Sequence, residues 1–376
     1  MSTNKKIVLC MIVKNEAHVI ERCLASTLPV IDSYCIVDTG STDGTQEKIK
    51  KFFDQLGIEG QIHERPWVSF GHNRTEALEL ARPLGDYSLM IDADEILEFA
   101  GDFDPEKFKA QLDKDMYGVF AKYGATRYHR PQFTSNKKRF YYRGVCHEYV
   151  ACHDKDTTHG FINGFINRPI QDGARSKDPE KYKKDAKLFE DALASGTTDP
   201  ADINRYHFYM AQSYRDSGQF EKAIEAYQKR ADLGGWNEEV FYSLFQVGKI
   251  KEHLGKYSLD EIIKHYIDAY NAAPFRAETL WTAAKLCQSY GRYDQAWRLI
   301  KQAVKLPLPE GALFVIEFIY EWAAVDTFAS VAYWVEEYEA CLRAINSLLN
   351  NPKVPPQERE RLEKNKQLVT QHILGR

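Results

Sequence analysis

Acidic residues follow three short apolar runs in the first hundred positions, namely Glu16, Asp38 and the pair Asp92 and Asp94. Two carboxylates separated by one residue can hold a divalent cation, and the cation can neutralise a diphosphate. An isolated Asp-x-Asp is more often a solvated loop or a helix cap. Carboxylates at neighbouring strand ends of a parallel sheet, however, meet at the edge where ligands bind. We therefore expect Asp92 and Asp94 to form part of a site for a metal and a phosphorylated ligand.

The elements that must position these carboxylates alternate between strand and helix. Short continuous apolar runs, typical of strands covered on both faces, predict strands at residues 7–13, 34–37 and 87–91, and a further short strand is expected near 61–63. Helical spacing of apolar residues predicts helices between them. Repeated β-α units of this length indicate a parallel sheet with right-handed crossovers. Tyr-rich runs at 116–121 and 139–150 are expected to add mixed or antiparallel strands to this sheet.

A different pattern occupies the second half of the chain. A Gly-x-aromatic motif recurs at intervals of 37 and then 36 residues, at Gly218, Gly255 and Gly291. Each copy stands between two helical patterns, so the region resembles tetratricopeptide repeats (TPRs), whose period is about 34 residues. The stretch 194–200 reads as a linker. We expect one domain over residues 1–197 and a helical repeat domain over 198–376.

Composition excludes several classes of protein. The 376 residues carry 50 Lys and Arg against 54 Asp and Glu, a formal net charge of −4, so we expect no nucleic-acid partner. The seven cysteines contain no CxxC pair, which favours a reducing compartment and a cytoplasmic protein. No run of 18 apolar residues predicts a transmembrane segment. Neither a P-loop nor a GxGxxG fingerprint is present.

Three blocks of the first domain together resemble the inverting family 2 glycosyltransferases of the GT-A fold. They are Lys14-Asn15-Glu16, the block 37–45 that contains Asp38, and Asp92-Ala-Asp94-Glu95. The resemblance covers about residues 5–195, and members of that family with a C-terminal TPR array exist. It implies an α/β GT-A-type nucleotide-sugar-binding domain with a mostly parallel sheet, followed by an all-α TPR-like superhelical domain.

The resemblance also implies roles on the donor side. Lys14, Asn15 and Glu16 belong to the nucleotide-sugar site, and Asp38 contacts the base or ribose. Asp92 binds ribose and metal, while Asp94 is favoured as the ligand of Mn²⁺ or Mg²⁺.

Two arginines are further donor-side candidates. Family members carry an Arg-Asn pair on the helix before the Asp-x-Asp element. Here the order is Asn73-Arg74, and the charge of Arg74 suits a diphosphate. Arg175 lies in a stretch that matches the family, although Gln171 replaces a frequent histidine, and we expect Arg175 to meet phosphate.

The acceptor side requires a general base, which removes the acceptor's proton as it attacks the anomeric carbon. The segment 142–148 resembles the Arg-Gly…His-Glu segment of the repeat-bearing members, so His147 and Glu148 are the candidates. Alternate residues on a strand face opposite ways, and we expect one of the two to face the site. A zinc site built with Cys146 and Cys152 is disfavoured, since the spacing is not that of paired chelating dipeptides.

These features predict a metal-dependent inverting glycosyltransferase of the hexosyltransferase type. It would use a nucleotide sugar, with UDP the expected nucleotide, and a glycan, peptide or protein acceptor. The TPR-like domain would recognise the acceptor, a partner protein or a second copy of itself in a homodimer. Two alternatives stay open: a nucleotidyltransferase built on a similar sheet, and a non-catalytic TPR scaffold whose first domain is a relic.

Overall fold

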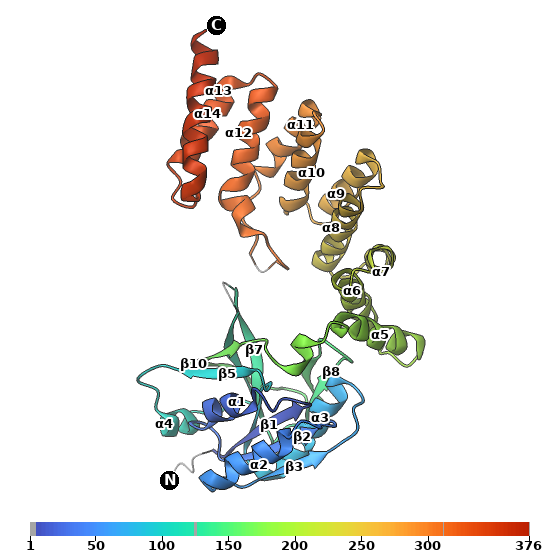
Figure 1. Ribbon diagram of the computed structural model, residues 1–376, viewed down its shortest axis with the longest axis vertical. Coiled ribbons are helices and arrows are strands. Elements are labelled where there is room, and N and C mark those ends of the chain that lie inside the picture. Colours follow the sequence, from blue (N-terminus) through green and yellow to red (C-terminus); the bar gives the residue numbers. More distant parts are fainter. Residues whose placement is uncertain (1–4, 124–125, 311, 376) are drawn as a thin grey trace. The chain divides into compact units, whose positions relative to one another are not determined.

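The computed structural model describes residues 5–123, 126–310 and 312–375. They form two compact units, of which the first ends at Thr198 and the second begins at Asp199 (Figure 1). The first unit combines sheets with helices, and the second is entirely helical. Within the described ranges, no helix combines the length and the apolar character that crossing a membrane requires.

The first unit is built on one large mixed sheet with the strand order β3-β2-β1-β4-β7-β6-β10-β5. The strands of the unit are β1 (Ile7–Val13), β2 (Ser33–Asp38), β3 (Gly60–Glu64), β4 (Tyr87–Met90), β5 (Glu95–Phe99), β6 (Met116–Tyr123), β7 (Thr126–Ser135), β8 (Phe140–Arg143), β9 (Tyr149–Cys152) and β10 (His159–Pro169). Its helices are α1 (Ile20–Thr27), α2 (Thr45–Leu56), α3 (Phe70–Ala81), α4 (Pro105–Ala110) and α5 (Lys181–Ala194). The four strands predicted in the first hundred residues are β1 to β4, and they pair in parallel.

Strand β1 lies at the centre of the parallel part and is covered on both faces. Ile7, Leu9 and Met11 belong to the core cluster that includes residues of α1 and α2. Val8 and Cys10, which alternate with them, pack in the cluster that includes residues of α3. Burial of both faces explains why this strand is a continuous apolar run rather than an alternating one.

The chain segment 139–150 differs from its prediction. The strands β8 and β9 within it pair with each other in a separate two-stranded sheet and do not extend the large one. Gly144, at a left-handed φ of 108°, opens the loop that separates them. The hairpin is held against α3, because Thr75 of that helix accepts a hydrogen bond from the backbone N–H of Tyr142 at 2.9 Å. By contrast, the predicted run 116–121 lies in β6, which does join the large sheet, together with β5, β7 and β10.

The second unit is an array of paired antiparallel helices (Figure 1). They are α6 (Pro200–Asp216), α7 (Phe220–Asp232), α8 (Asn237–Leu254), α9 (Leu259–Ala272), α10 (Glu278–Ser289), α11 (Tyr293–Ala303), α12 (Ala324–Trp334), α13 (Tyr338–Leu349) and α14 (Pro356–Leu374). The repeated glycines 218, 255 and 291 lie at the turns inside three successive pairs, with φ values of 75°, 65° and 71°. These left-handed angles explain why glycine recurs at the helix ends.

A buried ion network connects the helix pairs of this unit. The Arg276 side chain is 1% exposed and pairs with Glu278 at 2.8 Å and with Glu238 of α8. Glu238 also accepts a hydrogen bond from the backbone N–H of Leu313 at 2.9 Å, and Arg276 donates to the Leu313 carbonyl at 3.0 Å. The network therefore ties the starts of α8 and α10 to the segment that precedes α12.

Removing the cation of this network should destabilise the helical unit strongly. Arg276→Met leaves two carboxylates buried without a counter-charge, and the expected loss is about 3–5 kcal/mol of unfolding free energy. Urea denaturation followed by far-UV circular dichroism measures it. Arg292→Met is the matched control, because Arg292 pairs with Asp260 on the exposed surface and should cost at most about 1 kcal/mol. Equal losses in the two variants would contradict the structural role of the buried network.

Candidate active site

The loops after β1 and β2 are held together at the carboxyl edge of the sheet. Val13 and Asp38 are paired in register at the ends of these strands. The backbone N–H of Asn15 donates to Ser41 Oγ and the Asn15 Oδ1 accepts from the N–H of Thr42, both at 2.8 Å. Asn15 has a left-handed φ of 58°, which asparagine tolerates. Asn15 therefore positions the loop that follows Asp38.

Asp38 presents an unpaired carboxylate oxygen at this edge. The residue is fully buried, and its Oδ1 accepts hydrogen bonds from the backbone N–H groups of Gly40 and Ser41, both at 2.8 Å. Its Oδ2 is buried and has no hydrogen-bond partner among the described residues. Buried polar atoms are rarely left without a partner, so an oxygen of this kind at a ligand-binding edge fits a hydrogen-bond donor supplied by a ligand. Lys14, which follows β1 directly, is exposed.

Arg74 of α3 connects two of the predicted site residues. Its Nη2 lies 2.6 Å from Asp92 Oδ1, and its Nε lies 2.7 Å from Glu148 Oε1. The Arg74 and Glu148 side chains are 11% and 12% exposed, so this contact is largely shielded from water. The guanidinium also lies over the ring of Tyr142, 5.6 Å from its centre. The reversed order Asn73-Arg74 thus brings an arginine to the centre of the site, while the buried Asn73 binds the loop before α3.

The bridge favours the charged forms of Asp92 and Arg74. Burial by itself raises the pKa of Asp92, but the nearby guanidinium groups, Arg74 first and then Arg130, together outweigh it, and the pKa of Asp92 is lowered. In the same way, burial lowers the pKa of Arg74, whereas the carboxylates of Asp92 and Glu148 raise it beyond its ordinary value. Neighbouring opposite charge therefore dominates over desolvation at this point of the site.

A second pair of carboxylates lies beneath the segment that follows β10. The backbone N–H of Gly173 donates to Asp94 Oδ2, and that of Ala174 donates to Glu16, each at 3.2 Å. A Cβ atom on Gly173 would stand 3.0 Å from Asp94 Oδ2, so glycine permits this close approach. Burial raises the pKa of Glu16 to about 7, with a further contribution from the charges of Asp94 and Asp92. Burial and Asp92 likewise raise the pKa of Asp94.

The donor set of Asp94 and Glu16 fits a hard divalent cation. Neither carboxylate forms an ion pair with a side chain in the described part of the chain, and the charge of Asp94 raises the pKa of Glu16. Among the described residues, no group of three or more His, Cys, Asp and Glu side chains is arranged to hold a metal ion. Magnesium, however, is commonly bound by one or two carboxylates together with substrate phosphates. Asp92 differs from this pair, because its Oδ1 is engaged by Arg74.

The two candidate bases point to different neighbours. They lie in the loop 144–148 rather than on a strand, and His147 has a left-handed φ of 51°. The His147 ring is parallel to that of Phe189 of α5, with 6.4 Å between ring centres. Glu148 is directed to Arg74 instead. The loop, and not strand alternation, therefore separates the two side chains.

Arg175 lies close to the site but is held by other residues. It pairs with Asp185 of α5, and its guanidinium lies 4.2 Å from the ring centre of Phe70. Its contact with phosphate stays a prediction. The segment just before Arg175 is anchored as well, since Asp172 accepts two hydrogen bonds from the Arg22 guanidinium at 2.6 and 2.9 Å.

Sequence reasoning missed the residues that support Asp92 from below. Glu95 is almost fully buried and pairs with Arg130 of β7, whose Nη1 donates to Glu95 Oε1 at 2.7 Å. Asn167 donates to Glu95 Oε2 at 2.9 Å, and the same oxygen accepts from the backbone N–H of Asp92 at 3.2 Å. No local pattern links Glu95 to partners 35 and 72 residues away. Gly173 could have been found from the sequence, because it lies in the stretch around Arg175 that resembles the family.

Comparison with known proteins gives the following relatives. Residues 8–165 match the family model described as Glycosyl transferase family 2. An uncharacterized glycosyltransferase of Rickettsia felis is 30% identical over 124 residues, which cover 33% of this chain and 37% of that protein. A TPR repeat-containing protein of Synechococcus elongatus is 36% identical over 92 residues, 24% of this chain and 21% of that one. The chain thus spans about a fifth to just over a third of the length of these curated relatives.

Among solved structures, a tetratricopeptide repeat protein from Parabacteroides merdae aligns with a TM-score of 0.36 at 14% identity, covering 53% of this chain and 69% of that one. The identity of the first unit follows from the family model and from the carboxylates gathered at its strand ends. Residues 8–165 are a glycosyl transferase family 2 domain, which this chain joins to a helical repeat unit of the TPR type.

Proposed function

We propose that this protein is an inverting glycosyltransferase that moves a sugar from a nucleotide sugar to an acceptor. The observation that carries the proposal is the Arg74 bridge. It places Asp92, a donor-side residue in the family 2 resemblance, one side chain away from Glu148, the candidate base. A single displacement needs both sides of the reaction within such a distance.

On the donor side, we assign the nucleoside to Asp38 and the diphosphate to the carboxylate pair. The unpaired Oδ2 of Asp38 accepts a hydrogen bond from the base or ribose, with UDP as the proposed nucleotide. Asp94 and Glu16 would hold Mn²⁺ or Mg²⁺. Bound there, the cation would neutralise charge on the departing nucleoside diphosphate. Arg74 orients Asp92 through its hydrogen bond. Its guanidinium is also the protein's own positive charge at the proposed diphosphate site.

On the acceptor side, Glu148 acts as the general base. Its carboxylate takes the proton of an acceptor hydroxyl as the oxygen attacks the anomeric carbon from the face opposite the diphosphate. The bond from that carbon to the phosphate oxygen breaks, and the configuration inverts. Arg74 keeps Glu148 oriented for this step. His147 is the weaker candidate, because its ring stacks on Phe189.

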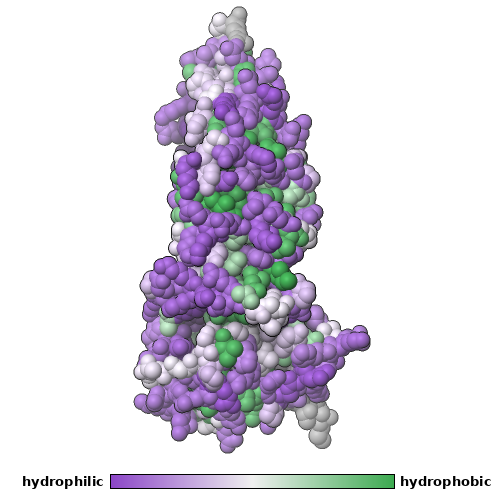
Figure 2. Space-filling view, turned by 90° about the vertical axis from the view of Figure 1, so that its right-hand side faces the viewer, coloured by the Kyte–Doolittle hydropathy of each residue, from purple (hydrophilic) through white to green (hydrophobic). Residues whose placement is uncertain are grey.

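We further propose a hexose as the transferred sugar, and a glycan, peptide or protein as the acceptor. Helical repeats present extended surfaces to partners. Apolar patches stand among hydrophilic residues on the face drawn in Figure 2, and exposed aromatics of the second unit include Trp236 and Trp334. This unit would recognise the acceptor, a partner protein or a second copy of the chain. All seven cysteines are free, in keeping with the reducing cytoplasm we propose as its location.

Asp94→Asn should abolish most metal-dependent turnover. The substitution removes half of the carboxylate pair, so we expect the release of nucleoside diphosphate from a UDP-hexose panel with Mn²⁺ to fall about a hundredfold or more. Asp102→Asn is the control, since Asp102 is an exposed carboxylate of the same unit. An unchanged rate in Asp94→Asn would contradict the proposed metal site. Release of pyrophosphate from a nucleoside triphosphate would instead indicate a nucleotidyltransferase, and the lack of any nucleotide-sugar binding would favour a scaffold.

Glu148→Gln should separate catalysis from donor binding. The amide keeps the shape of the side chain but cannot take the acceptor's proton, so kcat should fall about 10² to 10⁴-fold. The thermal shift produced by the nucleotide sugar should remain, because Glu148 is assigned to the acceptor side. His147→Gln is the comparison and should retain most of kcat. The assignment of the base fails if His147→Gln loses kcat while Glu148→Gln does not.

A further inference from the structure

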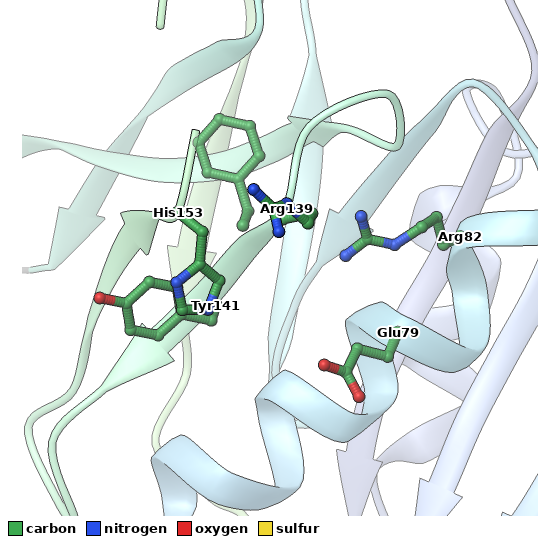
Figure 3. A pocket seen from close by; sticks show the side chains of 6 residues that line it. Glu79, Arg82, Arg139, Tyr141 and His153 are labelled. Atoms are coloured by element: carbon green, nitrogen blue, oxygen red, sulfur yellow. The ribbon is translucent and has the colours of Figure 1, made fainter. Parts of the chain in front are cut away.

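A cavity of about 270 Å³ lies on the first unit, away from the carboxylate edge (Figure 3). It is formed by the end of α3 and by the hairpin β8–β9, and its lining residues are Glu79, Arg82, Arg139, Phe140, Tyr141 and His153. Arg82 follows Arg74 by eight residues along α3 and its continuation. At 1.5 Å of rise per residue, the cavity is about 12 Å from the bridge at the active site. It is therefore a separate site on shared elements.

Two guanidinium groups meet at this cavity. The Arg82 side chain extends across it toward Arg139 (Figure 3). Arg139 is already neutralised, because its Nη2 pairs with Asp154 at 3.0 Å. Arg82 forms no ion pair within the described part of the chain, and its Nη1 donates to the carbonyl of Lys138 at 3.2 Å. Lys137 and Lys138, which directly precede Arg139 in the chain, add positive charge beside it.

The opposite wall is flat and aromatic. The rings of Tyr141 and His153 stack with 4.2 Å between their centres and 15° between their planes. Glu79, one turn before Arg82 on α3, contributes a carboxylate to the same cavity. The volume is below the roughly 300 Å³ at which pockets for drug-sized ligands begin, so it suits one ring and one small charged group.

We propose that this cavity binds a sugar phosphate. The uncompensated guanidinium of Arg82, supported by Arg139, takes the phosphate, since the planar guanidinium matches phosphate oxygens in a bidentate way. The Tyr141–His153 stack forms a wall for the ring, and the Glu79 carboxylate accepts hydrogen bonds from ring hydroxyls. A neutral sugar would leave Arg82 without a counter-charge.

Calorimetric titration of the full chain tests the proposal with three probes: inorganic phosphate, glucose 6-phosphate and glucose. We expect glucose 6-phosphate to bind more tightly than inorganic phosphate, and glucose not to bind. Arg82→Gln should weaken glucose 6-phosphate binding about tenfold to a hundredfold, which is typical for the loss of hydrogen bonds to a charged group. Arg82→Lys keeps the positive charge but loses the planar guanidinium with its paired donors, so it should weaken glucose 6-phosphate binding less than Arg82→Gln does.

Two control variants sharpen the test. Arg168→Gln removes the same charge elsewhere on the unit, where Arg168 pairs with Glu98, and should leave binding unchanged. Glu79→Gln should strengthen the binding of inorganic phosphate, because it removes a negative charge from the cavity. The proposal is overturned if glucose binds as well as its phosphate, if inorganic phosphate binds as tightly as glucose 6-phosphate, or if Arg168→Gln weakens binding as much as Arg82→Gln.

This inference does not depend on the proposed transferase activity. The titrations contain no nucleotide and no acceptor, and Arg82 is not part of the active site. Arg82→Gln should therefore leave nucleotide-sugar turnover unchanged while it weakens sugar-phosphate binding. A loss of turnover in this variant would show that the cavity and the active site are not separate, and would overturn the assignment.

Discussion

The site depends on one buried cation, Arg74, that carboxylates contact from two sides. Arg74 lies between Asp92 and Glu148, and it can reach both only where α3, the end of β4 and the β8–β9 loop converge. The backbones approach closely to permit this, since a Cβ atom on Gly71 would stand 2.1 Å from the carbonyl oxygen of Gly144. Loss of Arg74 would leave the largely shielded Glu148 carboxylate without this counter-charge. Donor side and acceptor side are thereby held in one arrangement.

The carboxylates of this edge fall into two electrostatic groups. Asp92 has a guanidinium beside it, and its pKa is lowered. Glu16 and Asp94 accept hydrogen bonds from backbone N–H groups and form no ion pair within the described ranges, and burial raises their pKa values. A divalent cation gains most where negative charge is least compensated, which is why we assign the metal to the second group. The family resemblance assigned metal to Asp92 as well, and that assignment remains a prediction.

Different sequence features predicted the two units. In the first unit, continuous apolar runs such as 7–13 identified β1, β2 and β4 to within a residue, because strands buried on both faces carry mostly apolar side chains. In the second, the glycines at 218, 255 and 291 identified the turns, because each adopts a left-handed φ at a helix end. The β8–β9 hairpin escaped prediction, since its short strands pair only with each other and pack against α3.

The sequence by itself determined the fold class, the repeat pattern and the acidic residues at the strand ends, because these depend on local periodicity and on the geometry of parallel strands. Tertiary structure alone decided which groups meet. The loop 144–148 directs Glu148 and His147 to different neighbours. Arg74, which is 74 positions earlier on α3, contacts Glu148. The backbone N–H groups of Gly173 and Ala174 bind Asp94 and Glu16. Such contacts leave no periodic signal, because residues distant in sequence are brought together only when the complete chain packs.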